Sequence, residues 1–256
     1  MLQQTQISRV VQKYPDFLRK FPGFPSLAHA RTVDVIRTWA GMGYNNRALR
    51  LQRLAKKVLR ETNGRLPSSV DALQKLPGIG RYTANAIACF AFGMQTAVVD
   101  TNVRRVLARL FPRETRSRDE WELAQWILPE GKAYDWNQAM MELGSTVCTS
   151  RNPRCKDCPL HRQCPSAFQI QRVNKPAKKN GRAIIPNRIY RGRIVTALLA
   201  LSRRQSIEAS RLLILITADD SKKNMKWFAG LLTGLQHDGL IHVVHRQKKQ
   251  FLSLPQ

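Results

Sequence analysis

Acidic residues are scarce in this sequence. Only 17 Asp and Glu stand against 43 Lys and Arg, which gives a formal net charge of +26. Such an excess favours a polyanionic partner, because each phosphate that a Lys or Arg neutralises releases a counterion. A basic surface that is merely solvated would give the same composition. The charge therefore favours nucleic acid as the partner without locating a site.

Long apolar runs are also missing. No stretch reaches the roughly 20 apolar residues that a membrane-spanning helix requires, and the first residues, MLQQTQISRVV, lack the basic-then-apolar layout of a secretory signal. We therefore expect no membrane partner and a cytoplasmic, nucleoid-associated location. Nothing in the sequence indicates an oligomer, so a monomer is the default expectation.

Cysteine is rare outside one segment. Four of the five cysteines follow the spacing C-x6-C-x2-C-x5-C, and these are Cys148, Cys155, Cys158 and Cys164. Thiolates this close in sequence favour a soft metal centre, either one tetrahedral zinc or an iron–sulfur cluster. Disulfides are the less favoured alternative, because no secretory signal accompanies the cysteines. The spacing by itself leaves zinc and a cluster both open.

The segment LPGIGRYTA at residues 76–84 contains two glycines and lies between two predicted helices. Gly78 and Gly80 allow a tight turn and a close approach to a phosphate, and the amides that open the following helix can face that phosphate. The segment predicts a helix–hairpin–helix that binds the DNA backbone without reading its sequence, with Arg81 as a further DNA-binding residue.

A single carboxylate begins the segment DTNVRRVLARL at residues 100–110. Asp100 is well placed as the N-cap of a helix over residues 101–110. A helix N-terminus also favours negative charge, and an ionised carboxylate can stabilise a sugar that becomes positive in an oxocarbenium-like transition state. The capping role and the chemical role are compatible.

Apolar periodicity organises the rest of the chain. It predicts helices over residues 1–20, 26–43, 48–61, 71–75, 84–92, 120–128 and 136–147. Residues 169–187 read as a basic linker. Residues 188–256 carry an amphipathic helix, a second helix over 226–238, and alternating strands at 241–244 and 250–254 around a basic turn. That order predicts a winged-helix-like module whose hairpin or second helix contacts DNA, or a packing module without DNA contact.

Several motifs of this chain, in the right order, resemble those of the endonuclease III and adenine DNA glycosylase (MutY-like) superfamily. The resemblance covers residues 1–168. It implies a mainly α, helix–hairpin–helix glycosylase fold with a six-helix barrel over 1–112 and a cluster domain over 113–168, followed by the small α+β module. It also implies that the four clustered cysteines ligate a [4Fe–4S] cluster rather than zinc.

The same resemblance assigns the reacting groups. Asp100 takes the place of the family's catalytic aspartate and Asn102 that of its polar neighbour. Tyr82 stands where the bifunctional branch has a Lys that forms a Schiff base with the sugar. Because a phenol forms no imine, the resemblance implies monofunctional hydrolysis, with Tyr82 positioning Asp100 or the nucleophile.

Residues that handle the duplex are implied as well. MLQQTQ resembles the family segment that wedges into DNA, which places Gln4, with Gln3 beside it, in the gap left by a flipped base. Tyr44, in WAGMGYNNR, takes the place of a Tyr that stacks into the duplex. Glu142, in NQAMMELG, takes the place of an acidic residue that contacts the flipped base.

The function implied is base excision repair of double-stranded DNA, with release of adenine mispaired with 8-oxoguanine or guanine. Three departures keep alternatives open. Thr101 and Asn45 replace residues usual in the adenine branch, and the family's catalytic glutamate falls two residues before Met1. A thymine or uracil mismatch glycosylase, or a non-catalytic iron–sulfur DNA-binding protein, are the alternatives. We expect that the natural reading frame begins upstream of Met1 and restores the glutamate.

Overall fold

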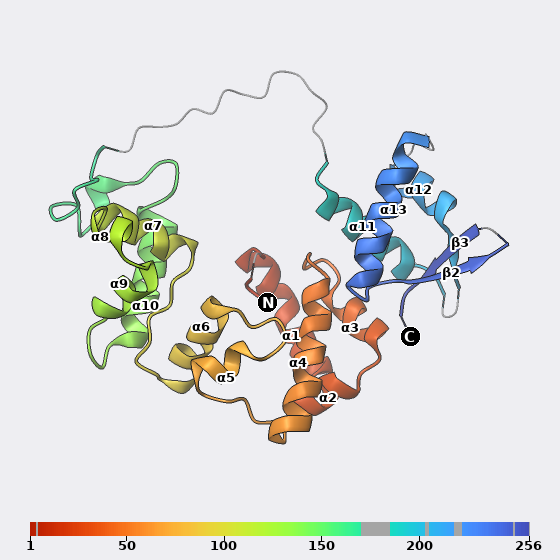
Figure 1. Cartoon of the computed structure of the whole chain (residues 1–256), viewed down its shortest axis with the longest axis horizontal. Helices are drawn as coiled ribbons and strands as arrows, with labels where there is room; N and C mark the ends of the chain where they lie inside the picture. The colour runs from red at the N-terminus through yellow and green to blue at the C-terminus, as the bar shows by residue number, and fades with distance from the viewer. Residues whose placement is uncertain (4, 170–184, 203–204, 218–221, 248, 256) are drawn as a thin grey trace. The chain divides into compact units, whose positions relative to one another are not determined.

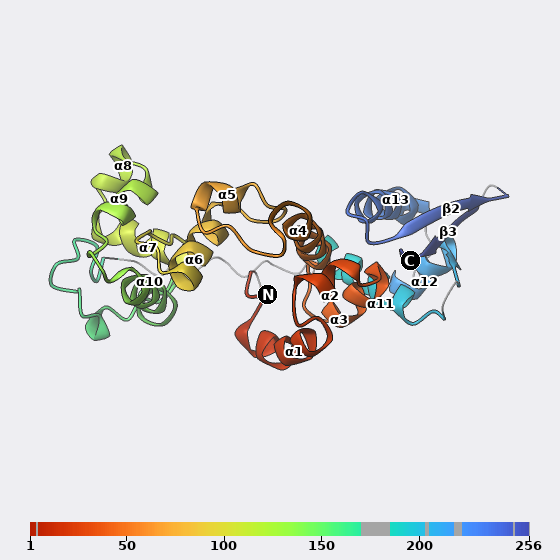
Figure 2. The same cartoon turned by 90° about the horizontal axis from the view of Figure 1, so that it is seen from below.

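The chain forms two compact units in a computed structural model, Met1–Leu66 with Gly181–Gln256, and Pro67–Asn180. The structure describes residues 1–3, 5–169, 185–202, 205–217, 222–247 and 249–255. Most of these residues are helical, and three short strands lie near the C-terminus (Figures 1 and 2). The mainly α prediction is confirmed. The predicted domain boundaries stay predictions, and most of the predicted linker over 169–187 lies outside the described residues.

The first unit combines both ends of the chain. Its first half holds four helices, α1 (Ile7–Lys20), α2 (Phe24–His29), α3 (Thr32–Trp39) and α4 (Asn46–Thr62). Its second half holds helices α11 (Asn187–Leu199), α12 (Ala209–Thr217) and α13 (Lys222–His237), and strands β1 (Ile207–Glu208), β2 (His242–Arg246) and β3 (Lys249–Ser253).

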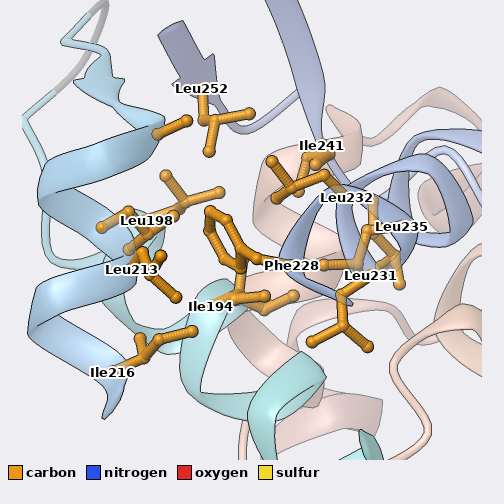
Figure 3. Packing of buried hydrophobic residues seen from close by; sticks show 14 of the residues in the cluster. Ile194, Leu198, Leu213, Ile216, Phe228, Leu231, Leu232, Leu235, Ile241 and Leu252 are labelled. Atoms are coloured by element: carbon orange, nitrogen blue, oxygen red, sulfur yellow. The ribbon is translucent and has the colours of Figure 1, made fainter. Parts of the chain in front are cut away.

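The two halves of this unit share a hydrophobic core. Phe228 of α13, Leu213 of α12 and Ile194 of α11 are buried against one another (Figure 3). Ile36 of α3 and Leu49 of α4 belong to the same cluster and are 0% and 4% exposed. Burial of this apolar surface is the main force that holds the C-terminal module on the N-terminal helices.

The C-terminal module contains the predicted first helix, second helix and hairpin, which are α11, α13 and the β2–β3 pair, and its likeness to a winged helix stays a prediction. Its sheet is antiparallel with strand order β1-β3-β2, and β2 pairs with β3 from His242↔Ser253 to Arg246↔Lys249. Helix α12 and strand β1 were not predicted. The run LLILI in α12 is apolar without interruption, so its periodicity does not separate a buried strand from a helix.

Two N-terminal helix predictions need correction. The helix predicted over residues 1–20 begins only at Ile7, and it continues through Pro15. The helix predicted over 26–43 is two helices, because the chain turns at Ala30. The buried Gln52 explains the break: its Nε2 donates to the carbonyl oxygens of Leu27 at 3.3 Å and Ala30 at 2.7 Å. These bonds satisfy carbonyl groups at the end of α2.

The second unit consists of helices that lead to the cysteine-rich loop. They are α5 (Val70–Gln74), α6 (Arg81–Phe92), α7 (Thr101–Leu110), α8 (Glu114–Ser117), α9 (Glu120–Trp126) and α10 (Ala133–Glu142). The helix predicted over 136–147 is wrong at both ends. α10 starts at Ala133 and passes at Leu143 into a wider π-helical turn, Leu143–Val147. A single 3-10 turn, Cys155–Asp157, follows within the loop.

Within the part of the chain that the structure describes, no helix is both long and apolar enough to cross a bilayer.

Candidate DNA-binding and catalytic site

The glycine turn of the second unit has the geometry of a helix–hairpin–helix. Ser69 caps α5 by accepting a hydrogen bond from the amide of Ala72 at 3.3 Å. Gly78 has a φ of +80°, a backbone conformation that a residue with a Cβ adopts only with strain. Gly80 is the N-cap of α6, and a Cβ there would meet no atom within 4 Å. The start of α6 therefore has space in front of it for a close backbone approach.

Arg81, predicted to bind DNA, is already engaged within the protein. Its Nη1 lies 3.0 Å from Oδ2 of Asp119, and its guanidinium lies over the ring of Trp121, 4.5 Å from the centroid. The side chain is nevertheless 51% exposed. Its DNA-binding role stays a prediction.

Asp100 is the N-cap of α7, as predicted, and both of its carboxylate oxygens are held. Oδ1 accepts from the backbone amides of Asn102 at 2.8 Å and Val103 at 2.7 Å. Oδ2 accepts from Nδ2 of Asn102 at 2.9 Å. The predicted pair of Asp100 and Asn102 is therefore in direct contact. Three donors at the helix N-terminus fix the orientation of the carboxylate.

Tyr82 and Asp100 are close enough to interact electrostatically. Burial raises the pKa of the Tyr82 phenol, and the negative charge of Asp100 raises this pKa further. The phenol therefore stays neutral and keeps its proton at physiological pH. The residue as a whole is 37% exposed. The catalytic roles of both residues remain predictions.

A buried amide that the sequence did not single out positions the segment before Asp100. Asn137 on α10 is 3% exposed. Its Oδ1 accepts from the amide of Val98 at 2.8 Å, while its Nδ2 donates to the carbonyls of Thr96 at 3.0 Å and Ala133 at 2.8 Å. The sequence did offer one signal for this role, an asparagine at a buried position of a helix. Buried polar groups are nearly always hydrogen-bonded, so such an amide is expected to hold other segments.

Arg105 is a second residue whose role the sequence did not reveal. Its Nη2 donates to Oδ1 of Asn102 at 2.8 Å and to the carbonyl of Gly144 at 2.5 Å, and its Nε donates to the carbonyl of Cys148 at 2.9 Å. A continuous hydrogen-bonded path therefore runs from Asp100 through Asn102 and Arg105 to the first cysteine of the loop.

The four loop cysteines line one pocket, together with Arg109 and His161. Burial raises the pKa of the Cys164 thiol, and the other three cysteines raise it further through their negative charge. Arg109 donates to Sγ of Cys148 at 3.2 Å and to the carbonyls of Thr149 and Ser150. Among the described residues, no three His, Cys, Asp or Glu side chains are grouped closely enough to hold a single ion.

The first unit carries the residues predicted to enter the duplex. Tyr44 follows a turn with two left-handed glycines, has a φ of +44° and is 43% exposed. Arg47 joins this turn to the first residues of the chain: it donates to the carbonyl oxygens of Gln3 and Met1 and to Oγ1 of Thr5, and it stacks on Tyr44. Gln3 and Tyr44 are thus tied together through Arg47. Gln4 lies outside the described residues.

Glu142, predicted to contact the flipped base, is the last residue of α10 and is exposed. Its backbone carbonyl accepts from the hydroxyl groups of Ser145 at 3.1 Å and Thr146 at 2.7 Å. The role of its carboxylate stays a prediction.

Comparison with protein families decides the family of this chain. Residues 1–128 match the model of the HhH-GPD superfamily base excision DNA repair proteins. The chain belongs to this superfamily. The helix–hairpin–helix at Gly78–Gly80 and the capped carboxylate of Asp100 both lie within the matched part.

Relatives of this superfamily member include several adenine DNA glycosylases. The human adenine DNA glycosylase is 44% identical over 67% of this chain and 33% of its own length. The enzymes of Mycobacterium tuberculosis and Buchnera aphidicola are 43% and 34% identical, over 62% and 74% of this chain. The chain spans from 33% to 55% of the length of these relatives.

Solved structures of the superfamily share the fold. A thermostable thymine-DNA glycosylase is similar with a TM-score of 0.63 and 31% identity, over 66% of this chain and 81% of that protein. Endonuclease III in a non-covalent DNA complex is similar with a TM-score of 0.59 and 27% identity, over 65% of this chain and 79% of that chain. The predicted helix–hairpin–helix glycosylase fold is confirmed.

Proposed function

We propose that this protein is a monofunctional DNA glycosylase that releases adenine mispaired with 8-oxoguanine or guanine. The observation that carries the proposal is the carboxylate of Asp100, held by three donors at the start of α7 and interacting with the neutral phenol of Tyr82. Such a fixed negative charge stabilises a developing oxocarbenium ion without reorganising during the reaction.

Adenine is the favoured base because the adenine DNA glycosylases reach 44% identity, whereas the structurally similar thymine-DNA glycosylase is 31% identical. In the proposed reaction, the glycine turn binds phosphates and the target nucleotide leaves the base stack. Asp100 stabilises the cationic sugar while water attacks C1′, and the base departs in its protonated form.

Double-stranded DNA with a mispaired base is the proposed partner. The net charge of +26 and the open helix start at Gly80 support it, and the similar endonuclease III structures are DNA complexes. The absence of a Lys at position 82 supports hydrolysis without an imine intermediate.

Excision assays test the proposal directly. The protein is expressed with every codon that precedes Met1 in its reading frame and is given duplexes with A opposite 8-oxoguanine, A opposite G, T opposite G, and U opposite G. We expect release of adenine from the first two duplexes only, and no covalent complex on addition of borohydride. Release of thymine with adenine spared would establish the mismatch alternative, and efficient trapping would refute monofunctional hydrolysis.

A [4Fe–4S] cluster is the proposed cofactor, held by Cys148, Cys155, Cys158 and Cys164. The four thiols line one pocket, and their C-x6-C-x2-C-x5-C spacing, which resembles the cluster loop of the superfamily, favours a cluster over zinc. The cluster would supply structure, since it would cross-link the loop that Arg105 and Arg109 tie to α7.

Metal analysis checks this assignment. Protein purified without oxygen should contain about four iron atoms per chain and absorb near 400 nm, as expected for thiolate-ligated iron. Cys158→Ser should lower both signals, whereas Cys89→Ser, which changes the buried cysteine of α6, should leave the iron content unchanged. Stoichiometric zinc and a colourless protein would contradict the cluster.

A further inference from the structure

A groove of about 440 Å³ lies within the first unit, between the N-terminal helices and the C-terminal module. One wall is the turn that carries Tyr44, Asn45 and Asn46. The other wall is α11, which contributes Arg188, and Arg9 of α1 also lines the groove. The groove therefore borders the side chain that we expect to stack into the duplex.

The walls of the groove are fixed with respect to each other. Ile36 and Leu49 are buried in the core of the C-terminal module. Arg53 of α4 donates to the carbonyl of Asp238 at 3.3 Å, and the carboxylate of Asp238 forms an ion pair with Arg191. These contacts hold the C-terminal module against the N-terminal helices. Both walls of the groove therefore belong to one packed structure.

The arginines of α11 differ in what they contact. Arg191 pairs with Asp238, and Arg193 donates to the carbonyl of Ile216 at 3.1 Å and stacks on Tyr190. Arg188 is exposed, and within the described part of the chain it makes no hydrogen bond or ion pair. Arg9, across the groove, is likewise exposed and unpaired among the described residues.

The remaining lining suits a nucleic acid strand. The floor is apolar, with Val195, Leu199 and Leu240, while Asn45 and Asn46 add amide donors at the edge. Asp238 is the single acidic residue among the described lining residues, and Arg191 neutralises it. Unpaired guanidinium groups over an uncharged floor match the phosphates and sugars of a DNA backbone.

We propose that this groove is a second backbone-binding site for the duplex, in which Arg9 and Arg188 contact phosphates next to the position of Tyr44. The C-terminal module thereby extends the DNA-binding surface through α11. The inference rests on the proposed function in that the ligand is the same duplex. It differs from the sequence-based expectation, which gave the contact to the hairpin or to the second helix of the module.

Two basic residues in the described part of the hairpin have partners within the protein. Lys249 of β3 lies 3.1 Å from Oε2 of Glu208, and the guanidinium of Arg246 lies over the ring of Phe251, 6.0 Å from its centroid. Arg246 therefore provides the variant that separates a hairpin contact from a groove contact.

The test is the salt dependence of DNA binding by the full chain, measured by fluorescence anisotropy with matched and A·8-oxoguanine duplexes. Arg9→Ala and Arg188→Ala should each reduce the slope of log Kd against log salt concentration by about 1, and the double variant by about 2. Arg211→Ala, on α12 outside the groove, removes the same charge and should leave the slope unchanged. Thermal unfolding of each variant verifies that the fold is intact.

Unchanged slopes for Arg9→Ala and Arg188→Ala would overturn the groove assignment, whatever the excision activity. A reduced slope in Arg246→Ala alone would show that the hairpin contacts the DNA, and this result would also overturn the groove assignment. If the slope falls equally in the Arg9, Arg188, Arg211 and Arg246 variants, the effect comes from the overall positive charge. The groove would then be no specific binding site. Excision is a separate readout: reduced slopes with no release of adenine would leave the groove in place and remove the proposed function.

Discussion

Asp100→Asn should reduce the rate of base excision by about 10³-fold or more, while DNA binding and stability change little. The size of the effect follows from the loss of a preorganised charge in the transition state. Asparagine has nearly the shape of aspartate and is equally good as an N-cap. Its Oδ1 can still accept from the amides of Asn102 and Val103, the contacts that Asp100 makes now. The variant therefore separates the chemical role from the capping role.

The measurement is a single-turnover rate on the A·8-oxoguanine duplex, together with Kd and the melting temperature. Asp119→Asn is the matched control, because Asp119 is also an N-cap whose Oδ1 accepts a backbone hydrogen bond, from Trp121 at 3.2 Å. It should keep its excision rate within a few-fold. If Asp100→Asn loses melting temperature and DNA binding but retains its rate, the residue is only a helix cap.

Asp100 also illustrates how far the sequence reaches. Its place before an amphipathic segment predicted the cap, and the structure has α7 over Thr101–Leu110 as expected. The turn at Gly78–Gly80 was equally readable, because left-handed backbone and close approach restrict the residue type at the position itself. Helix caps and tight turns depend on residues that are neighbours in the sequence, so the sequence alone can predict them.

The roles of Arg105 and Asn137 could not be predicted in the same way. Arg105 contacts a carbonyl 43 positions away, at Cys148, and Asn137 holds Val98, 39 positions away. Each role depends on which segments meet in the folded unit, and no local pattern encodes that. For the same reason, the sequence did not predict that Ile36 and Leu49, which lie on N-terminal helices, pack into the core of the C-terminal module.

Gly144→Ala should destabilise the protein by about 3 kcal/mol, near the upper end of the usual cost of overpacking. A Cβ at Gly144 would lie 2.7 Å from Cβ of Asn102 and 3.0 Å from its carbonyl carbon and oxygen. Two of these three atoms are backbone atoms of α7, so no side-chain rotation relieves the contact. Either the π-helical turn Leu143–Val147 or the first turn of α7 must move.

Excision should fall by about 10²-fold in the same variant, because a shift of Asn102 displaces the amide that orients Asp100 and small misplacements of reacting groups are costly. Denaturant unfolding and single-turnover rates measure the two effects. Gly230→Ala is the control: its added Cβ meets no atom within 4 Å, and this exposed position of α13 should gain up to about 1 kcal/mol from the better helix former. A Gly144→Ala protein as stable and active as the parent would show that α7 and the turn before the cysteine loop are not in the close contact on which the position of Asp100 depends.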